Sequence, residues 1–454
     1  MTTKNLIISL FVLISLNLTA QTANKLAQTP PLGWNSWDCY GMVPTDADMR
    51  KTADYMAKYM KSAGYQYVVL DMGWDFKDTM NTFNFKMKKP DLWFDKYGRL
   101  TPNPGRFPYV KNGKGLKPLA DYIHSLGLKF GIHIQRGIPY QAVEQNTPIK
   151  GTKYTAKQIY TDSMQCVWYQ GMKSIDMKKP GAQEYYNSLF ELYAEWEVDF
   201  VKADDMREPD VIAVSKAIKN CGRPMVLSLV GGTKGGAKIL YENNVNMWRV
   251  SGDVWDDWAF MDRAFSAARR WQKDVKPGHW PDLDMLPLGR LRINGTDGIL
   301  ANTIRKEFVE TVDEYSRLTK DEQYSLMNLW AIFRTPLMMG GSLVDMDKEL
   351  LDMLTNKNML AVNQYSINNK ELRATPTEVV WTADEPGTGA KYVAVFNLSD
   401  KPSLPINVNW CELGITGEYE VSDVWTGNSV GIYTNYFQSS YKPHASGLYK
   451  LTKK

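Results

Sequence analysis

Residues 199–204, Asp-Phe-Val-Lys-Ala-Asp, form a short apolar run that ends in charged side chains. A helical pattern precedes this run at Ala182–Trp196, where apolar residues recur at three- and four-residue spacing. Continuous apolar runs, as opposed to alternating ones, are typical of strands that are covered on both faces. The segment therefore predicts a buried parallel strand that follows a helix.

The same combination of a short apolar run and a helical pattern recurs along most of the chain. The strand candidates are Pro31–Trp37, Tyr67–Met72, Lys129–Ile134, Asp199–Asp204, Met225–Leu229, Met247–Ser251, Trp280–Met285 and Thr335–Met339. Further helical patterns lie between them at Ala47–Ser62, Leu116–Leu126 and Trp258–Gln272. Strands that alternate with helices in this number predict an α/β fold, a (β/α)₈ barrel of the TIM type.

The sequence pattern changes after about Asn363. Short runs separated by turn residues follow, without helical patterns between them, at Val379–Thr382, Tyr392–Asn397, Ile406–Asn409, Tyr419–Trp425 and Gly447–Leu451. Such runs predict a small antiparallel β domain, a sandwich. We therefore expect a catalytic barrel at residues 25–363 and a C-terminal β-sandwich domain at residues 364–454.

The first twenty residues read as a signal peptide. A basic start at Lys4 is followed by the apolar stretch Leu6–Leu16 and by small residues that end at Ala20. We therefore expect a secreted or periplasmic protein. No later window holds about 18 uninterrupted apolar residues, so the sequence predicts no membrane span.

Charge and metal-ligating residues exclude several function classes. Lys and Arg number 54 against 50 Asp and Glu, a net charge of +4, and a basic patch of the kind that binds nucleic acid is absent from the sequence. The chain has 4 His and 4 Cys, with no His-Glu-x-x-His and no Cys-x-x-Cys motif. We expect no metal and no cofactor. The cysteines are either paired in one of three ways or are buried free thiols.

Catalytic groups of such barrels lie at the carboxyl ends of the strands. The carboxylates at the predicted ends are Asp38, Asp71, Asp204, Asp205, Asp253, Asp282 and Asp284. Lys202 shares a strand face with Asp204, and Arg249 precedes Asp253 by four residues. An acidic cluster with fixed cations fits the two-carboxylate chemistry of glycoside hydrolysis. The alternative is structural: a single strand-end Asp often caps a helix or forms a turn, and Lys202 can serve a structural ion pair.

The aromatic residues also fit a protein that acts on sugars. The chain has 15 Trp and 25 Tyr, whose flat faces with polar handles suit sugar rings. The tryptophans in the predicted strand segments are Trp34, Trp37, Trp74, Trp248, Trp255 and Trp280. Most aromatic residues of a globular protein fill the core, so this signal supports the carboxylate pattern and does not replace it.

Several motifs in order resemble one enzyme family. They are Thr29-Pro-Pro-Leu-Gly-Trp-Asn-Ser-Trp-Asp38, Asp95-x-Tyr-Gly-Arg-Leu-x-Pro-Asn-Pro-Gly-Arg-Phe-Pro108, Val198-Asp-Phe-Val-Lys-Ala-Asp204, Arg249-Val-Ser-Gly-Asp253 and Trp280-Pro-Asp-Leu-Asp-Met-Leu286. From about residue 29 to Tyr365 the chain resembles glycoside hydrolase family 27, the melibiase or α-galactosidase family. The resemblance implies a retaining, metal-free exo-glycosidase with a β-sandwich behind the barrel.

The resemblance also implies residue roles. Asp204 would be the nucleophile and Asp253 the general acid/base. The substrate-binding residues would be Trp34, Asp71, Trp74, His133, Lys202, Arg249 and Asp284. Trp34 would form the floor of the sugar subsite, and Asp284 with Arg249 would hold the 2-hydroxyl side. We expect an oligosaccharide or polysaccharide substrate.

Three departures from the family pattern fall where the sugar is recognised. Met72 stands where many α-galactosidases have a second Asp, His133 replaces a Tyr, and Leu229-Val230-Gly231 occupies the position of a specificity group. The sequence favours an α-galactosidase that uses double displacement. The alternatives are a relative that acts on another sugar, namely a β-L-arabinopyranosidase, an α-N-acetylgalactosaminidase or an α-glucan exo-hydrolase, or a catalytically silent carbohydrate-binding protein.

Overall fold

The computed structural model describes residues 26–77, 89–231, 236–295, 299–302, 307–310 and 312–454. The predicted signal peptide, residues 1–20, lies outside the described residues.

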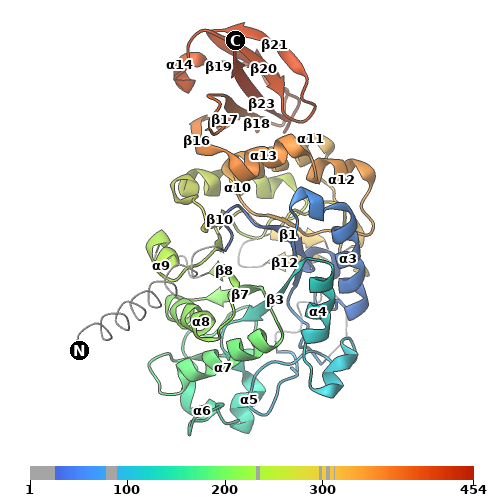
Figure 1. The fold of residues 1–454 in the computed structure, drawn as a ribbon, viewed down its shortest axis with the longest axis vertical. Helices are drawn as coiled ribbons and strands as arrows, with labels where there is room; N and C mark the ends of the chain where they lie inside the picture. Colours follow the sequence, from blue (N-terminus) through green and yellow to red (C-terminus); the bar gives the residue numbers. More distant parts are fainter. Residues whose placement is uncertain (1–25, 78–88, 232–235, 296–298, 303–306, 311) are drawn as a thin grey trace, which may run out of the picture.

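Eight parallel strands form one curled sheet in the order β10-β9-β8-β7-β3-β2-β1-β15 (Figure 1). The strands are β1 (Leu32–Asn35), β2 (Tyr67–Leu70), β3 (Lys129–Gln135), β7 (Phe200–Met206), β8 (Val226–Gly231), β9 (Met247–Arg249), β10 (Trp280–Asp282) and β15 (Leu337–Met339). Leu286 closes the sheet: its N donates to Met338 O at 2.8 Å, and its O accepts from Gly340 N at 2.9 Å. All eight predicted strands and the barrel are confirmed.

The predicted helices are also found, within a few residues of their expected ends. They are α3 (Asp46–Tyr59), α4 (Lys117–Ser125), α7 (Ala182–Glu195) and α10 (Trp258–Trp271). Helix α3 begins at a capping box between Thr45 and Asp48, and it buries Met49, Ala53 and Met56 against the barrel. Two more helices complete this outer layer, α8 (Glu208–Asn220) and α11 (Lys320–Phe333).

An insertion follows β3 that the sequence analysis does not predict. It contains β4 (Ile138–Pro139), α5 (Tyr140–Gln145), α6 (Ala156–Ile159), β5 (Tyr160–Thr161) and β6 (Met172–Ile175). Its strands form a small sheet in the order β4-β6-β5. The other short elements of the barrel region are α2 (Trp37–Tyr40), α9 (Gly236–Glu242), β11 (Arg290–Leu291), β12 (Ile299–Asn302), β13 (Glu307–Glu310), β14 (Glu314–Tyr315), α12 (Lys348–Leu354) and α13 (Lys357–Tyr365), with 3-10 turns at Lys61–Ala63, Pro108–Asn112 and Gln272–Asp274.

The C-terminal domain contains an antiparallel sheet in the order β16-β17-β18-β23-β20-β21 and a ladder of β19 with β22. The strands are β16 (Ile367–Ala374), β17 (Glu378–Asp384), β18 (Lys391–Asn397), β19 (Ile406–Asn409), β20 (Glu418–Asp423), β21 (Ser429–Thr434), β22 (Tyr436–Ser439) and β23 (Ser446–Lys453), with α14 (Trp410–Leu413) after β19. The five predicted strands are confirmed. Strands β16, β21 and β22 are not among the predicted ones, because most of their side chains are at least partly exposed and form no apolar run.

Helix α11 joins the two domains, as Figure 1 shows with α10, α11 and α13 between the barrel and the sandwich. Ser325 Oγ donates to His444 O at 2.5 Å, and Trp425 Nε1 donates to Asn328 Oδ1 at 2.9 Å. The His444 ring stacks on Trp258 with 4.2 Å between ring centroids. A shared apolar core, ring stacking and polar bonds therefore hold the sandwich against the barrel.

All four cysteines are free thiols, so the disulfide alternative does not hold in this structure. Within the described ranges, none of the helices has the length and apolarity needed to cross a membrane.

Candidate active site

The carboxyl ends of β1, β2 and β7 meet at a buried ion pair. Lys202 Nζ lies 2.8 Å from Asp71 Oδ2, and Asn35 Nδ2 donates to the same oxygen at 2.6 Å. Burial alone would raise the pKa of Asp71, but the positive charge of Lys202 holds it well below its ordinary value. The sequence spacing suggests that Lys202 pairs with Asp204 on its own strand. In the structure its partner is Asp71, across the barrel interior.

Asp204 lies next to this pair, near the end of β7. Its Oδ1 accepts a hydrogen bond from Asp205 N at 2.6 Å, and its Oδ2 lies 3.3 Å from His133 Nε2 on β3. Asp205 has a φ of 52°, a left-handed conformation that costs energy in a residue other than glycine. The strained backbone turns the Asp204 carboxylate toward β3.

Arg136 holds that strained backbone, and sequence reasoning does not identify it as a site residue. The buried guanidinium donates to Asp205 O at 2.7 Å from Nε, and to Asp205 Oδ2 at 2.6 Å from Nη2. It also donates to Met164 O at 3.0 Å and to Ser174 Oγ at 2.7 Å, both in the insertion after β3. The only signal in the sequence is an arginine directly after a buried strand.

A second group of charges stands at the ends of β9 and β10. Arg249 Nη2 donates to Asp253 Oδ1 at 2.9 Å, and its Nη1 donates to Asp284 Oδ1. Asp284 is buried, has a φ of 94°, and accepts from Val254 N at 2.8 Å. Burial, together with the charges of Asp253 and Asp282, raises the pKa of Asp284, although Arg249 opposes the shift. The side chain of Asp253, by contrast, is 64% exposed.

The two groups face one small space. A cavity of about 20 Å³ is lined by residues of both, among them Asn35, Lys202, Val230, Arg249, Asp282 and Asp284. A volume of that size holds about one water molecule. The fold therefore brings polar and charged side chains of β1, β7, β9 and β10 together around a common centre.

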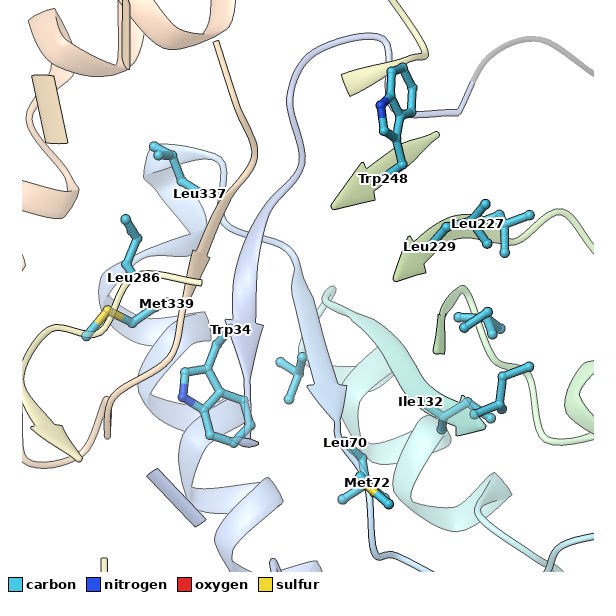
Figure 2. Packing of buried hydrophobic residues seen from close by; sticks show 14 of the residues in the cluster. Trp34, Leu70, Met72, Ile132, Leu227, Leu229, Trp248, Leu286, Leu337 and Met339 are labelled. Atoms are coloured by element: carbon cyan, nitrogen blue, oxygen red, sulfur yellow. The ribbon is translucent and has the colours of Figure 1, made fainter. Parts of the chain in front are cut away.

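The tryptophans named as sugar platforms are buried. Trp34 Nε1 donates to Gly341 O at 2.9 Å, and Trp74 Nε1 donates to His133 O at 2.9 Å. Figure 2 shows Trp34 and Met72 beside the carboxyl ends of neighbouring strands. Trp280 starts β10, and its Nε1 donates to Ala27 O, so it lies at the opposite end of the barrel. Trp34 and Trp74 are close to the charged cluster, whereas Trp280 is not.

This arrangement can support acid/base and nucleophilic chemistry. It offers a carboxylate with a hydrogen-bonded histidine, an exposed carboxylate beside an arginine, and buried ionic pairs between them. In the part of the chain that the structure describes, no set of three or more His, Cys, Asp or Glu side chains is placed to hold a metal ion. A barrel with such strand ends and an attached β-sandwich defines a glycoside hydrolase.

The chain belongs to glycoside hydrolase family 27, the melibiase or α-galactosidase family. The family model described as alpha galactosidase A matches residues 29–147, 140–299 and 311–365. The model of the alpha galactosidase C-terminal beta sandwich domain matches residues 376–451. Both domains of the chain are therefore those of the family, and the resemblance found in the sequence is confirmed.

Known relatives differ in the sugar that they act on. A family 27 β-L-arabinopyranosidase from Geobacillus stearothermophilus is 43% identical with a TM-score of 0.87, covering 94% of this chain and 97% of that one. A candidate α-N-acetylgalactosaminidase from Bacillus halodurans is 40% identical with a TM-score of 0.82, covering 95% and 99%. Alpha-galactosidase 2 of Arabidopsis thaliana is 26% identical, covering 95% of this chain and 91% of that protein.

Proposed function

We propose that this protein is a retaining exo-glycosidase that releases terminal β-L-arabinopyranosyl residues. The sequence motifs favour an α-galactosidase, with this activity as an alternative. The 43% identity to a β-L-arabinopyranosidase, against 26% to a plant α-galactosidase, supports the alternative. The structural observation that carries the proposal is the buried Met72 directly after Asp71.

The chemistry of the two sugars explains why Met72 matters. β-L-Arabinopyranose has the ring configuration of α-D-galactopyranose, with a hydrogen in place of the hydroxymethyl group at C5. A methionine side chain offers only a weakly accepting sulfur to a hydroxyl group. A buried hydroxyl without a partner costs about 1–3 kcal/mol, so the sugar that lacks this group fits an apolar wall better.

Asp204 and Asp253 carry the proposed reaction. The Asp204 carboxylate attacks the anomeric carbon, the bond from that carbon to the glycosidic oxygen breaks, and Asp253 donates its proton to the departing oxygen. Asp253 then accepts a proton from water as the water oxygen attacks the anomeric carbon and releases Asp204. Two inversions retain the configuration. Retaining enzymes hold their two carboxyl groups about 5–5.5 Å apart, and we expect this separation in the complex with substrate.

Neighbouring residues support these roles. His133 on one side and the Asp205 N–H on the other orient the Asp204 carboxylate. Asp71, held by Lys202 and Asn35, presents carboxylate oxygens that can accept hydrogen bonds from sugar hydroxyls, and the Arg249–Asp284 pair offers donors and acceptors on the opposite side. Export, inferred from the first twenty residues, is part of the proposal, and the N-terminal sequence of the mature protein tests it.

The experiment is a comparison of aryl glycosides. We expect kcat/KM for the β-L-arabinopyranoside to exceed that for the α-D-galactopyranoside by about tenfold or more, with release of the β anomer in an NMR time course. A preference for the α-galactoside or the α-N-acetylgalactosaminide contradicts the proposal.

Met72 is tested in the same assay. The Met72→Asp variant is expected to shift the ratio toward the α-galactoside, since the new carboxylate can accept a bond from the additional hydroxyl. Met72→Leu, which keeps the site apolar at similar volume, is the matched control and leaves the ratio unchanged.

A further inference from the structure

Three large apolar side chains are exposed on one short segment, residues 162–171, which we call the 162–171 loop. It connects β5 with β6 in the insertion after β3. Met164 is 65% exposed, Val167 is 72% exposed and Trp168 is 39% exposed. Single exposed apolar residues are ordinary in globular proteins. Three within five residues are unusual, and exposed apolar patches often mark binding sites.

The guanidinium group of Arg136 links the loop to the catalytic strand. Arg136 Nη2 donates both to Met164 O at 3.0 Å and to Asp205 Oδ2 at 2.6 Å. The backbone of the loop and the residue after the proposed nucleophile thus share one donor atom. Met164 has a φ of 57°, so the loop keeps a strained turn at this point of attachment.

The far end of the loop is also anchored at the site. Tyr169 stacks on Phe76 with 6.0 Å between centroids and 5° between planes. With Trp74 and His133, Tyr169 lines a cavity of about 10 Å³. The Gln135 amide in this cavity is buried, and among the described residues neither its nitrogen nor its oxygen has a hydrogen-bond partner. The loop therefore continues the wall of the sugar site outward.

One ion pair lies at the two ends of the loop. Lys173 Nζ lies 2.7 Å from Asp162 Oδ1, and both side chains are accessible at the ends of the loop. A flat aromatic face matches a sugar ring, which has apolar faces and hydroxyl groups around its rim. The charged groups at the ends of the same loop can bond to such hydroxyl groups.

We propose that the 162–171 loop forms the subsite for the leaving-group sugar, with Trp168 packed against the apolar face of that ring. The inference rests on the proposed function and extends it: the natural substrate is a carbohydrate chain, and the enzyme recognises the sugar from which the terminal residue is cut.

The test compares two substrates that share one glycone. The first is a disaccharide with a hexose leaving group, and the second is the glycosyl fluoride, whose leaving group is a single atom. For Trp168→Ala we expect kcat/KM on the disaccharide to fall about five- to tenfold relative to the fluoride. Trp168→Phe keeps a flat face and is expected to retain most of the ratio.

The matched control is Tyr365→Ala. Tyr365 is also an exposed aromatic residue, at 65%, but its neighbour Gln364 bonds to Pro30 O before β1, at the other end of the barrel. An unchanged ratio for Trp168→Ala overturns the proposal. A changed subunit number of this variant in light scattering overturns it too, because the loop is then a contact between copies of the chain.

The glycone in this test is whichever sugar the wild type hydrolyses. Failure on β-L-arabinopyranosides then contradicts the proposed function, while the ratio of the two substrates still decides the leaving-group subsite.

Discussion

Arg249 Nη2 lies 2.9 Å from Asp253 Oδ1, so an arginine is bound directly to the proposed general acid. A neighbouring cation favours the ionised form of a carboxyl group, whereas the first chemical step needs the protonated form. Protonation of Asp253 in the free enzyme therefore competes with this ion pair.

The first prediction concerns the pH profile. Removal of the cation in Arg249→Gln favours the protonated form of the acid, so we expect the alkaline limb of kcat/KM to move to higher pH, with lower maximal activity. The control is Arg269→Gln, which removes an exposed arginine paired with Glu371 away from the site. An alkaline limb that stays in place in Arg249→Gln contradicts the role of the pair.

The second prediction separates the two carboxylates. Asp253→Ala removes the proton donor, and general acid catalysis contributes about 10²–10⁴-fold. We expect that loss in kcat/KM for an alkyl glycoside and a much smaller loss for a dinitrophenyl glycoside, whose leaving group needs no proton. Asp204→Asn is expected to abolish turnover of both substrates. If the two variants respond alike to the leaving group, the assignment of roles is wrong.

The third prediction concerns the stability of the Lys202–Asp71 pair. Lys202→Met leaves the buried Asp71 carboxylate without its cation, and we expect a loss of about 3–5 kcal/mol in unfolding free energy at pH 7 by urea denaturation. The loss shrinks as pH falls toward 4, because the unpaired Asp71 of the variant then takes up a proton. It shrinks further below pH 4, where the wild type gradually loses the stabilisation that the lowered pKa of Asp71 provides.

The double variant Asp71→Asn, Lys202→Met serves as the control for that prediction. It removes both charges and is expected to recover most of the lost stability at pH 7. Equal instability of the single and double variants would show that packing around the lysine stem, and not the unpaired charge, causes the loss.

The fourth prediction concerns Asp75. Burial raises the pKa of this carboxyl group to about 6, which is above its ordinary value. The folded state then binds a proton more tightly than the unfolded state, so this group lowers stability as pH rises from about 4 to 6. Asp75→Asn lacks that penalty and is expected to be more stable than wild type by about 1–3 kcal/mol at pH 8 and equally stable at pH 4.

Thermal unfolding over this pH range measures the effect of Asp75→Asn. Asp352→Asn, an exposed position on α12, is the control and should follow the wild-type curve. A difference between Asp75→Asn and wild type that does not depend on pH would refute the assignment.

Much of the barrel can be predicted because its strands are buried on both faces and therefore appear in the sequence as continuous apolar runs. Val68, Val69 and Leu70 of β2 are all fully buried, and the charge of Asp71 marks where the strand ends. Strands such as β21 could not be predicted, since a strand with few buried side chains has no apolar period to detect.

The site could be predicted in part for a related reason. Strand ends gather carboxylates, and their positions along the chain identify Asp253 and Asp284 as neighbours, both of which bond to Arg249. Cross-strand partners do not follow from spacing: Lys202 pairs with Asp71 from another strand, and Arg136 reaches Asp205 from β3. Tryptophan content likewise does not reveal that Trp34 is fully enclosed or that Trp280 lies at the opposite end.

The polar contacts of α11 make the sandwich part of the barrel's own stability. Ser325 and Asn328 both bond to Ser446 Oγ, the first at 2.9 Å and the second at 2.8 Å, from a helix whose other face packs in the barrel wall. A chain cut after Tyr365 would expose these groups, together with the apolar residues around them, to solvent. The catalytic domain is therefore not a portable module: engineering that transplants or truncates it must carry the C-terminal sheet along, or rebuild the outer face of α11.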